Sequence, residues 1–561
     1  MNATRTRWLT LFTGAALAAM LVWQAWSQHV TPADLPSGDA AYYSAQALEL
    51  RALLLNGAWG ALVERLTWPE LHPPLHALLM ALWSLIFGVS QASLRSYGAV
   101  VTTIALVVLL PAMGHRMAPR GGAVAGMLAA LTLLLGPYQP VHLFTTMTEP
   151  THLLTWVLVL GLAAHSWQHQ RPWTSLLVGA ALCDAALVRY SNLPLLLTPL
   201  VLADLLTRWP TPWRTRALRW ACWLAPTAVV FGAWYGVEPA LPRAIAAFLV
   251  TAQPATSPGL MGWLWTPWIF AERFIGSWLL ALPLMFIFTA GLVPLFARRE
   301  LSRSSQLGGL ALDLRLGRPA GLALVQLSVL VGLLALSAHP YKVTRNMSAL
   351  APLLVFAAML PWLGSRVLWR GRGVGTQAVL AVAGLLLVAQ WGLQPGKAGA
   401  HTKPSGALVR MTNDHPAHLA QPGLAEVLAL LRQGSRGSHT LLLRGWGYPE
   451  PLVHSWAADI RLEAQLVTHW DPAALVAEPG NPSSAAVALV RPPSAPKKRG
   501  ERDDIAQVAA TLETAGCRPE PHARTSEGWQ VRWLRCPMDN AESAHLTFTR
   551  EDHIRRELDQ R

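Results

Sequence analysis

The chain has 561 residues, of which 52% are hydrophobic and only 14% are charged. A soluble domain carries roughly 25% charged residues, so the composition excludes a protein that is water-soluble over its whole length. The net charge is +14, which Arg-rich cytoplasmic loops explain in a membrane protein. No basic patch is interleaved with aromatic residues, the usual footprint of nucleic-acid binding, and we expect no nucleic-acid partner.

Apolar segments recur up to about residue 394, each near the length that a helix needs to cross a bilayer. We predict a polytopic α-helical membrane protein with about 11 spans. The predicted spans are 9–27, 97–113, 122–137, 150–166, 174–188, 193–206, 220–237, 277–296, 320–338, 346–363 and 375–393. The spans 174–188 and 193–206 are short, and one broken helix is the alternative. The first span follows Arg5 and Arg7 without a clean cleavage site, which favours an uncleaved anchor.

The apolar stretch 73–87 decides the topology, because every later loop changes side if it spans. With this stretch lying flat on the outer surface, the Arg-rich loops face the cytoplasm, as the positive-inside rule requires. These loops hold Arg116, Arg120, Arg171, Arg208, Arg214, Arg216, Arg219, Arg298, Arg299, Arg303, Arg315, Arg318, Arg366, Arg370 and Arg372. We therefore expect an integral plasma (inner) membrane protein of the cell envelope, with its C-terminal domain extracytoplasmic.

The same topology gathers ionisable residues at the outer surface. They are Asp39, Glu70, His72, Glu149, Arg189, His339, Lys342 and Arg345. Asp39, in Ser-Gly-Asp-Ala-Ala, is a candidate general base or an oxygen ligand for a divalent cation. The alternative for Asp39 is a helix N-cap.

The other outer residues suit an anionic ligand. His72 precedes two prolines that fix its backbone, and it either contacts an anionic headgroup or faces solvent. Glu149 precedes Pro150 beside apolar sequence, where an ionisable group is costly, although an acid also suits a helix start. Arg189 can hold a phosphate with two N–H groups or extend to the interface. Two carboxylates and several cations beside lipid fit a reaction between a phosphorylated lipid and a hydroxyl or amine.

The order of these features resembles the GT-C superfamily of membrane glycosyltransferases, over roughly residues 8–365. Within it, the chain is most similar to protein O-mannosyltransferases and lipid A aminoarabinose transferases. The matching residues are Gly38-Asp39-Ala-Ala-Tyr-Tyr, His72-Pro73-Pro74-Leu75, Phe87-Gly88, Arg95, Glu149, Leu-Val-Arg189-Tyr190, and Arg345 with Ala351-Pro352.

The resemblance implies an inverting glycosyltransferase that moves a sugar from a polyprenyl-phosphate donor to a lipid, glycan or protein acceptor at the extracytoplasmic face. It implies Asp39 and Glu149 as catalytic residues, and His72, Arg189 and Arg345 as ligands of the donor phosphate. Further candidates are Glu70, Tyr190, His339 and Lys342. Where many relatives carry an acidic pair, Ala40 follows Asp39 here, which leaves a divalent cation open, with Asp39 as its ligand.

Residues 1–394 are predicted to form the transmembrane catalytic domain, and residues 395–561 a soluble α/β domain that caps the site, binds acceptor or is structural. Helices are expected at 424–431 and 505–515, and strands at 440–444, 485–490 and 529–535. Cys517 and Cys536 are candidates for a disulfide, with two free thiols as the alternative.

Two other function classes compete with the enzyme. A transporter or flippase of lipid or lipid-linked sugar needs ionisable groups near the bilayer midplane and often internal repeats, and we see no clear repeat. A non-catalytic GT-C-like lipid-binding protein is the third class.

Overall fold

The structure is a computed structural model of the chain. It describes residues 3–30, 38–67, 73–119, 121–134, 142–169, 171–207, 212–239, 284–289, 292, 319–338 and 348–363. In the C-terminal region it describes residues 440–443, 464–467, 485–491, 510, 513–514, 517–519, 523–524 and 530–536. The predicted span 375–393, most of 277–296 and the predicted helix 424–431 lie outside these ranges.

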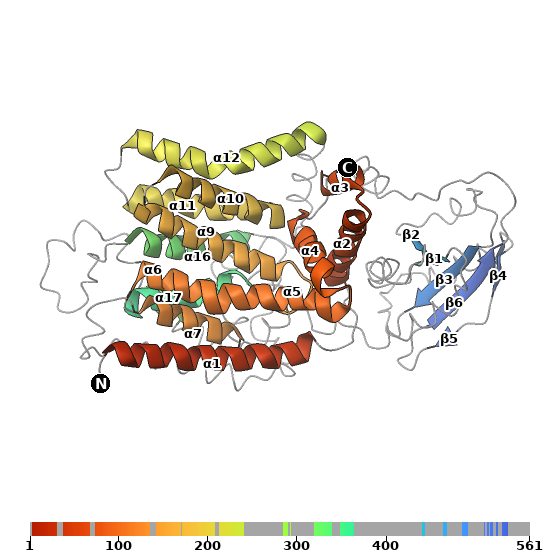
Figure 1. The fold of residues 1–561 in the computed structure, drawn as a ribbon, viewed down its shortest axis with the longest axis horizontal. Helices are drawn as coiled ribbons and strands as arrows, with labels where there is room; N and C mark the ends of the chain where they lie inside the picture. Colours follow the sequence, from red (N-terminus) through yellow and green to blue (C-terminus); the bar gives the residue numbers. More distant parts are fainter. Residues whose placement is uncertain are drawn as a thin grey trace, which may run out of the picture. The chain divides into compact units, whose positions relative to one another are not determined.

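Helices form nearly all of the described N-terminal part, and strands follow in the C-terminal part (Figure 1). The helices are α1 (Ala3–His29), α2 (Gly38–Leu55), α3 (Trp59–Thr67), α4 (Leu75–Phe87), α5 (Gln91–Thr103), the π-helix η1 (Ile104–Leu109), α6 (Leu110–Met117), α7 (Gly122–Leu134), α9 (Glu149–His169), α10 (Pro172–Val188), α11 (Asn192–Thr207), α12 (Trp213–Val237), α16 (Pro319–Ala338) and α17 (Leu350–Leu363). The strands are β1 (Thr440–Leu443), β2 (Ala464–Val467), β3 (Ala485–Arg491), β4 (Arg518–Pro519), β5 (Ala523–Arg524) and β6 (Gln530–Cys536).

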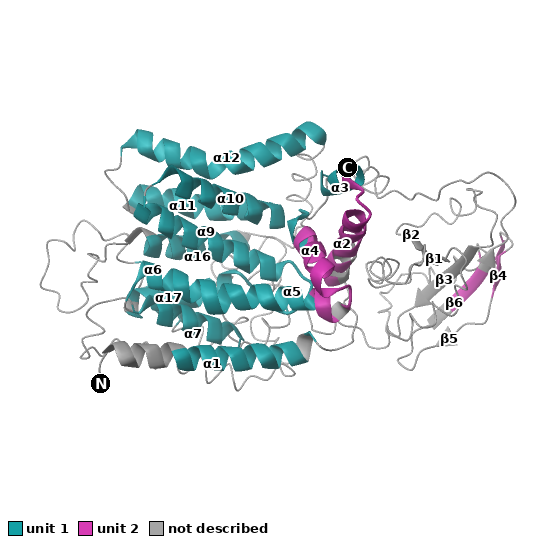
Figure 2. Cartoon of the chain, in the orientation of Figure 1, with its two compact units in different colours: residues 1–31, 60–76, 95–414 teal, residues 32–59, 77–94, 415–561 magenta. Residues whose placement is uncertain are grey.

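The chain divides into two compact units (Figure 2). Unit 1 comprises residues 1–31, 60–76 and 95–414, and unit 2 comprises residues 32–59, 77–94 and 415–561. The predicted domain boundary at 394/395 lies outside the described residues and stays a prediction.

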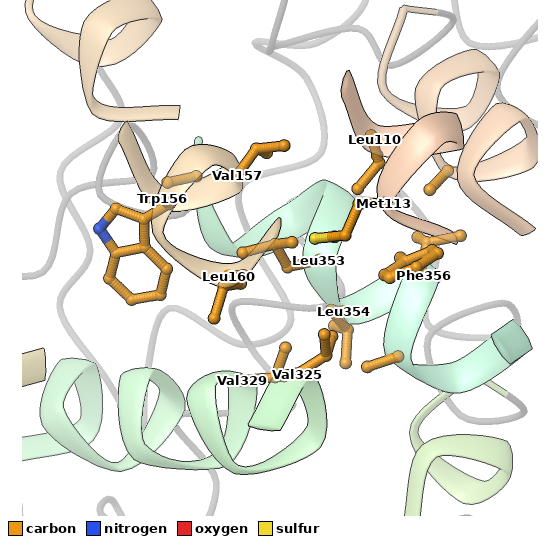
Figure 3. Packing of buried hydrophobic residues seen from close by; sticks show 14 of the residues in the cluster. Leu110, Met113, Trp156, Val157, Leu160, Val325, Val329, Leu353, Leu354 and Phe356 are labelled. Atoms are coloured by element: carbon orange, nitrogen blue, oxygen red, sulfur yellow. The ribbon is translucent and has the colours of Figure 1, made fainter. Parts of the chain in front are cut away.

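Long helices of unit 1 run alongside one another (Figure 1). Their core contains a large apolar cluster, part of which Figure 3 shows. Leu110 and Met113 of α6, Trp156 of α9, Val325 of α16 and Phe356 of α17 belong to it. These side chains are at most 3% exposed. Because each of these helices buries apolar side chains, the apolar segments of the sequence coincide with the helices.

Two described helices are long and apolar enough to cross a membrane: Ala92–Met117, which joins α5, η1 and α6, and α12. Shorter apolar helices accompany them, α4 among them. With 13 residues, α4 is about 20 Å long, less than the hydrocarbon thickness of about 30 Å. It ends at Gly88, whose φ of 87° is typical of a glycine that closes a helix. The interfacial placement of 73–87 stays a prediction.

The broken-helix alternative is resolved in favour of two helices. α10 ends at Val188 and α11 begins at Asn192, and the two helices pack against each other. Arg189 is the C-cap residue of α10, with an extended backbone and its N–H bonded to the carbonyl of Ala185. The structure therefore places Arg189 at the end of a helix, whereas the resemblance had placed Leu-Val-Arg189-Tyr190 within a span.

Helices α10 and α12 pack closely at Gly179. A Cβ built on this residue would lie 2.8 Å from the carbonyl oxygen of Trp223 and 2.9 Å from Cδ of Pro226. Pro226 lies inside α12 and has no N–H to donate to Cys222, four residues earlier. The lack of a side chain at Gly179 therefore lets α10 contact the backbone carbonyls of α12 next to Pro226.

We expect Gly179→Val to destabilise unit 1 by about 1–3 kcal/mol, because the added side chain overlaps backbone that cannot rotate away. Thermal unfolding of the detergent-purified protein measures the loss. Gly232→Val on α12 is the control, since nothing lies within 4 Å of a Cβ built there. Equal melting temperatures for the two variants would contradict the proposed packing.

Unit 2 contains a six-stranded sheet with the order β2-β1-β3-β6-β4, and β5 also pairs with β6. β1 pairs in parallel with β2 and β3, whereas β3 and β6 are antiparallel, with Ala485 opposite Cys536. The predicted strands at 440–444, 485–490 and 529–535 are confirmed as β1, β3 and β6, and β2, β4 and β5 were not predicted. Because most of the predicted helix 505–515 is not described, the α/β class stays a prediction.

The structure shows Cys517 in a disulfide, and Cys183 and Cys222 as free cysteines. Cys517 precedes β4, and Cys536 ends β6, which pairs with β4. The side chain of Cys536 lies outside the described residues, so its pairing with Cys517 stays a prediction.

Candidate functional site

Residues 142–148 lead into α9 and lie against α5. The hydroxyl of Thr102 donates to the carbonyl of Leu143 at 3.0 Å. A Cβ built on Gly98 would lie 3.2 Å from that same carbonyl and closer still to the carbonyl of Thr145. Glycine and threonine on one face of α5 therefore let this polar segment approach a helix and fix where α9 begins.

Glu149 is the first residue of α9 and is fully buried. Its Oε1 lies 2.5 Å from Nη2 of Arg189, whose side chain is 22% exposed. Removing one partner from a buried ion pair leaves a charge in a poorly solvated place, which is strongly destabilising. An acid at a helix N-terminus and a cation at a helix C-terminus are also each favoured by the helix dipole. The pair thus locks the start of α9 to the end of α10.

Thr148 completes this arrangement, and we call Thr148, Glu149 and Arg189 the Glu149 site. The Thr148 hydroxyl accepts from Nε of Arg189 at 3.2 Å and from Nη2 at 2.8 Å. The Nη1 amino group makes no hydrogen bond in the part of the chain that the structure describes. Because the guanidinium is partly exposed, Nη1 can donate to a further anionic oxygen while Nε and Nη2 hold Thr148 and Glu149.

His76 lies close to the Glu149 site, fully buried at the start of α4. Its Nε2 is 3.0 Å from the carbonyl of Thr146, and its Nδ1 is 2.8 Å from the hydroxyl of Thr151. A carbonyl only accepts, so Nε2 carries the proton and Nδ1 accepts from Thr151. The Tyr97 hydroxyl lies 2.9 Å from the same Thr151 oxygen. The chain Tyr97–Thr151–His76–Thr146 holds His76 against α5 and α9 within unit 1.

Burial lowers the pKa of His76 from 6.5 to about 4, and Arg189 contributes in the same direction. The unfolded chain therefore binds more protons than the folded protein between these two values. We expect stability that is constant above about pH 6.5 and falls as the pH drops toward 4. Melting temperature against pH measures this loss. His76→Gln, which keeps a donor and an acceptor, should reduce the slope, and an unchanged slope would contradict the assignment to His76.

The structure brings Glu149 and Arg189 together, as a shared site requires. Tyr190 is only 7% exposed and lies in an aromatic cluster with Phe231 and Trp234, at ring-centroid distances of 6.3 and 6.4 Å. This packing gives Tyr190 a structural role that the sequence did not suggest.

Asp39 is the second residue of α2, so it lies inside the helix and not before it, where an N-cap would lie. Its side chain is not described. The remaining candidates, outside the described residues, are Glu70, His72, His339, Lys342 and Arg345.

Sequence reasoning missed Thr148, His76, Tyr97 and Thr151. Thr148 directly precedes Glu149, and a hydroxyl before a helix-entry acid was the available signal. His76 stands four residues after His72, in an apolar segment whose sequence gives no separate signal for a buried histidine. No three His, Cys, Asp or Glu side chains among the described residues come close enough to hold a metal ion.

Residues 71–235 match the family model described as dolichyl-phosphate-mannose-protein mannosyltransferase. This region covers His76, the Glu149 site and the helices between them. No curated protein matches the chain.

The structure is similar to two crystal structures of ArnT from Cupriavidus metallidurans. The one bound to undecaprenyl phosphate has a TM-score of 0.59 at 15% identity, covering 94% of this chain and 98% of that chain. The apo structure has a TM-score of 0.58 with the same identity and coverage. An oligosaccharyltransferase from Archaeoglobus fulgidus, AglB, matches with a TM-score of 0.49 at 12% identity, over 86% of this chain and 69% of that chain.

The chain therefore has the fold of the GT-C membrane glycosyltransferases. The resemblance that the sequence indicated, to the superfamily that holds the protein O-mannosyltransferases and ArnT, is confirmed by both the family model and the fold.

Proposed function

We propose that the protein is a glycosyltransferase that moves a sugar from a polyprenyl-phosphate donor to an acceptor at the extracytoplasmic face of the membrane. The observation that carries the proposal is the Glu149 site, where a buried carboxylate, a partly exposed guanidinium and a hydroxyl meet at the junction of two helices. The match of residues 71–235 to the family model described as dolichyl-phosphate-mannose-protein mannosyltransferase supports it. So does the fold shared with ArnT, which has been crystallised with undecaprenyl phosphate.

Arg189 suits the role of a phosphate ligand. Two of its nitrogens are fixed by Thr148 and Glu149, so the guanidinium plane is held in place before a ligand arrives. Such preorganisation lets Nη1 donate to the phosphate as negative charge develops on the leaving group, without first reordering the side chain. Glu149 offsets part of the Arg189 charge, which weakens ground-state binding of the donor and favours release of the lipid phosphate.

The proposed reaction is a single displacement at the sugar C1 atom. Asp39 accepts the proton of the acceptor hydroxyl or amine, and the acceptor oxygen or nitrogen forms a bond to C1 as the bond from C1 to the phosphate oxygen breaks. The polyprenyl phosphate leaves with that electron pair, and the configuration at C1 is inverted. Glu149 lines the site, while His72 and Arg345 assist Arg189 with the phosphate. A divalent cation at Asp39 stays a prediction.

Mass spectrometry of the surface glycans, lipids and proteins of a deletion strain tests the proposal and identifies the acceptor. We expect one glycoconjugate to lose a single sugar mass, and the gene for the unchanged protein to restore it. A gene carrying Glu149→Gln should not restore it, whereas one carrying Glu64→Gln, a change at an exposed residue of α3, should.

Liposomes separate this activity from transport. We expect the purified protein to release polyprenyl phosphate from its sugar conjugate only when the acceptor is present. Movement of a fluorescent lipid between leaflets without any release of polyprenyl phosphate would replace the proposal with a flippase.

A further inference from the structure

A second group of cationic residues lies at the far end of the same helices. α9 has 21 residues and is about 30 Å long, so His169 at its end is separated from Glu149 by the thickness of a hydrocarbon core. α10 returns from this end to Arg189. The end opposite Glu149 faces the cytoplasm in the predicted topology.

Three helix ends meet there. The side-chain amide of Gln168 on α9 donates to the carbonyl of Arg116 on α6 at 3.5 Å. Ser166 of α9 lies 3.1 Å from Ser175 of α10 through their hydroxyls, and Thr174 donates to Ser166 at 3.2 Å. These contacts hold the end of α9 between the end of α6 and the start of α10.

Five side chains on these ends are cationic or become so on protonation. We call His115, Arg116, His165, His169 and Arg171 the cation cluster. The rings of His165 and His169 are 4.2 Å apart between centroids, at an angle of 52°. Arg116 and His169 are close enough to His165 to interact with it electrostatically. The sequence contains no Asp or Glu over 104–148 or 150–183.

An apolar face adjoins the cation cluster on α10. Trp173, two residues after Arg171, is 52% exposed, and Leu176 and Leu177 are 44% and 42% exposed. Residues three and four apart lie on the same side of a helix, so the indole and the two leucines form one stripe along α10. A Trp at this level is typical of the membrane–water interface, with leucines toward the acyl chains.

We propose that the cation cluster binds the phosphodiester group of an anionic phospholipid whose acyl chains lie along Trp173, Leu176 and Leu177. Arg116 and the ring N–H groups of His165 and His169 donate to the phosphate oxygens. A free phosphate ion would satisfy the cluster but not the apolar stripe. The site is separate from the Glu149 site and does not depend on the proposed reaction.

The experiment uses the full chain, delipidated in detergent, with phosphatidylglycerol as the probe and phosphatidylcholine as the neutral lipid. Native mass spectrometry counts the lipids retained during titration. We expect selective retention of phosphatidylglycerol, and an affinity about fivefold lower for Arg116→Gln, since one cation near a membrane surface contributes that much. The triple variant with His165→Gln and His169→Gln should lose more, and Trp173→Ala should weaken binding of the same lipid.

Arg214→Gln is the matched control, because Arg214 is exposed on α12 at the same predicted face but outside the cation cluster. We expect it to bind phosphatidylglycerol as the unchanged protein does. Equal losses in Arg214→Gln and Arg116→Gln would overturn the proposal in favour of general surface charge. Displacement of the lipid by millimolar inorganic phosphate, or no effect of Trp173→Ala, would overturn it in favour of a phosphate site. Arg116→Gln is a single exposed change, so it remains informative if the triple variant does not fold.

Discussion

Replacing Asp39 by Asn is expected to abolish sugar transfer while the protein level and the melting temperature stay unchanged. Asparagine keeps the shape of the side chain but cannot accept the proton of the acceptor, and a positioned general base contributes roughly 10²–10⁴-fold to a rate. The measurement is release of polyprenyl phosphate from its sugar conjugate in liposomes, with the protein amount determined in the same sample.

Glu49→Gln is the control for Asp39→Asn, since Glu49 is exposed on the same helix, α2. We expect it to keep full activity. Asp39→Glu retains a carboxylate, so it should retain measurable transfer. Full activity of Asp39→Asn would remove Asp39 from the mechanism.

Arg189→Gln should lower both stability and activity, by separate routes. The substitution removes the cation that lies 2.5 Å from the fully buried carboxylate of Glu149. Breaking a buried ion pair costs about 3–5 kcal/mol. Glu149→Gln should cost less, because the 22% exposed Arg189 can still reach solvent. Thermal unfolding of both variants in detergent measures this asymmetry.

The double variant Glu149→Gln/Arg189→Gln distinguishes folding from catalysis. It leaves no buried charge at this position, so we expect it to regain much of the stability lost in Arg189→Gln while transfer stays absent. Arg214→Gln is the control for loss of one positive charge. Activity restored together with stability would mean that the pair only holds α9 and α10 together.

The helices of unit 1 follow from the sequence because each buries an apolar surface. The predicted spans at 150–166 and 320–338 correspond closely to α9 and α16. The helix at 91–117 extends further than the predicted span 97–113, since Ser93 and Arg95 are buried in it despite their polarity. Apolar length alone misses such a turn, and it also does not reveal the π-helical turn at 104–109.

Part of the Glu149 site was also foreseeable. The positive-inside rule puts Glu149 and Arg189 on the same face of the membrane, which is a necessary condition for their contact. Their pairing depends on how α9 and α10 pack, and on Gly98 allowing residues 142–148 to approach α5. Both depend on distances between segments that are far apart in the sequence, and residue types and their spacing do not predict such distances.

The length of α10 has a consequence for the lipid around the protein. The helix has 17 residues, about 26 Å, and an arginine bounds it at each end. In the predicted topology α10 spans the membrane, where a typical hydrocarbon core is about 30 Å thick. That topology therefore requires the bilayer to thin locally or α10 to draw its flanking charges inward. Arg189 is already held by Glu149 and Thr148 and cannot move freely. Hydrophobic mismatch in a thick bilayer would therefore pull directly on this ion pair, and lipids with shorter acyl chains should suit the protein best.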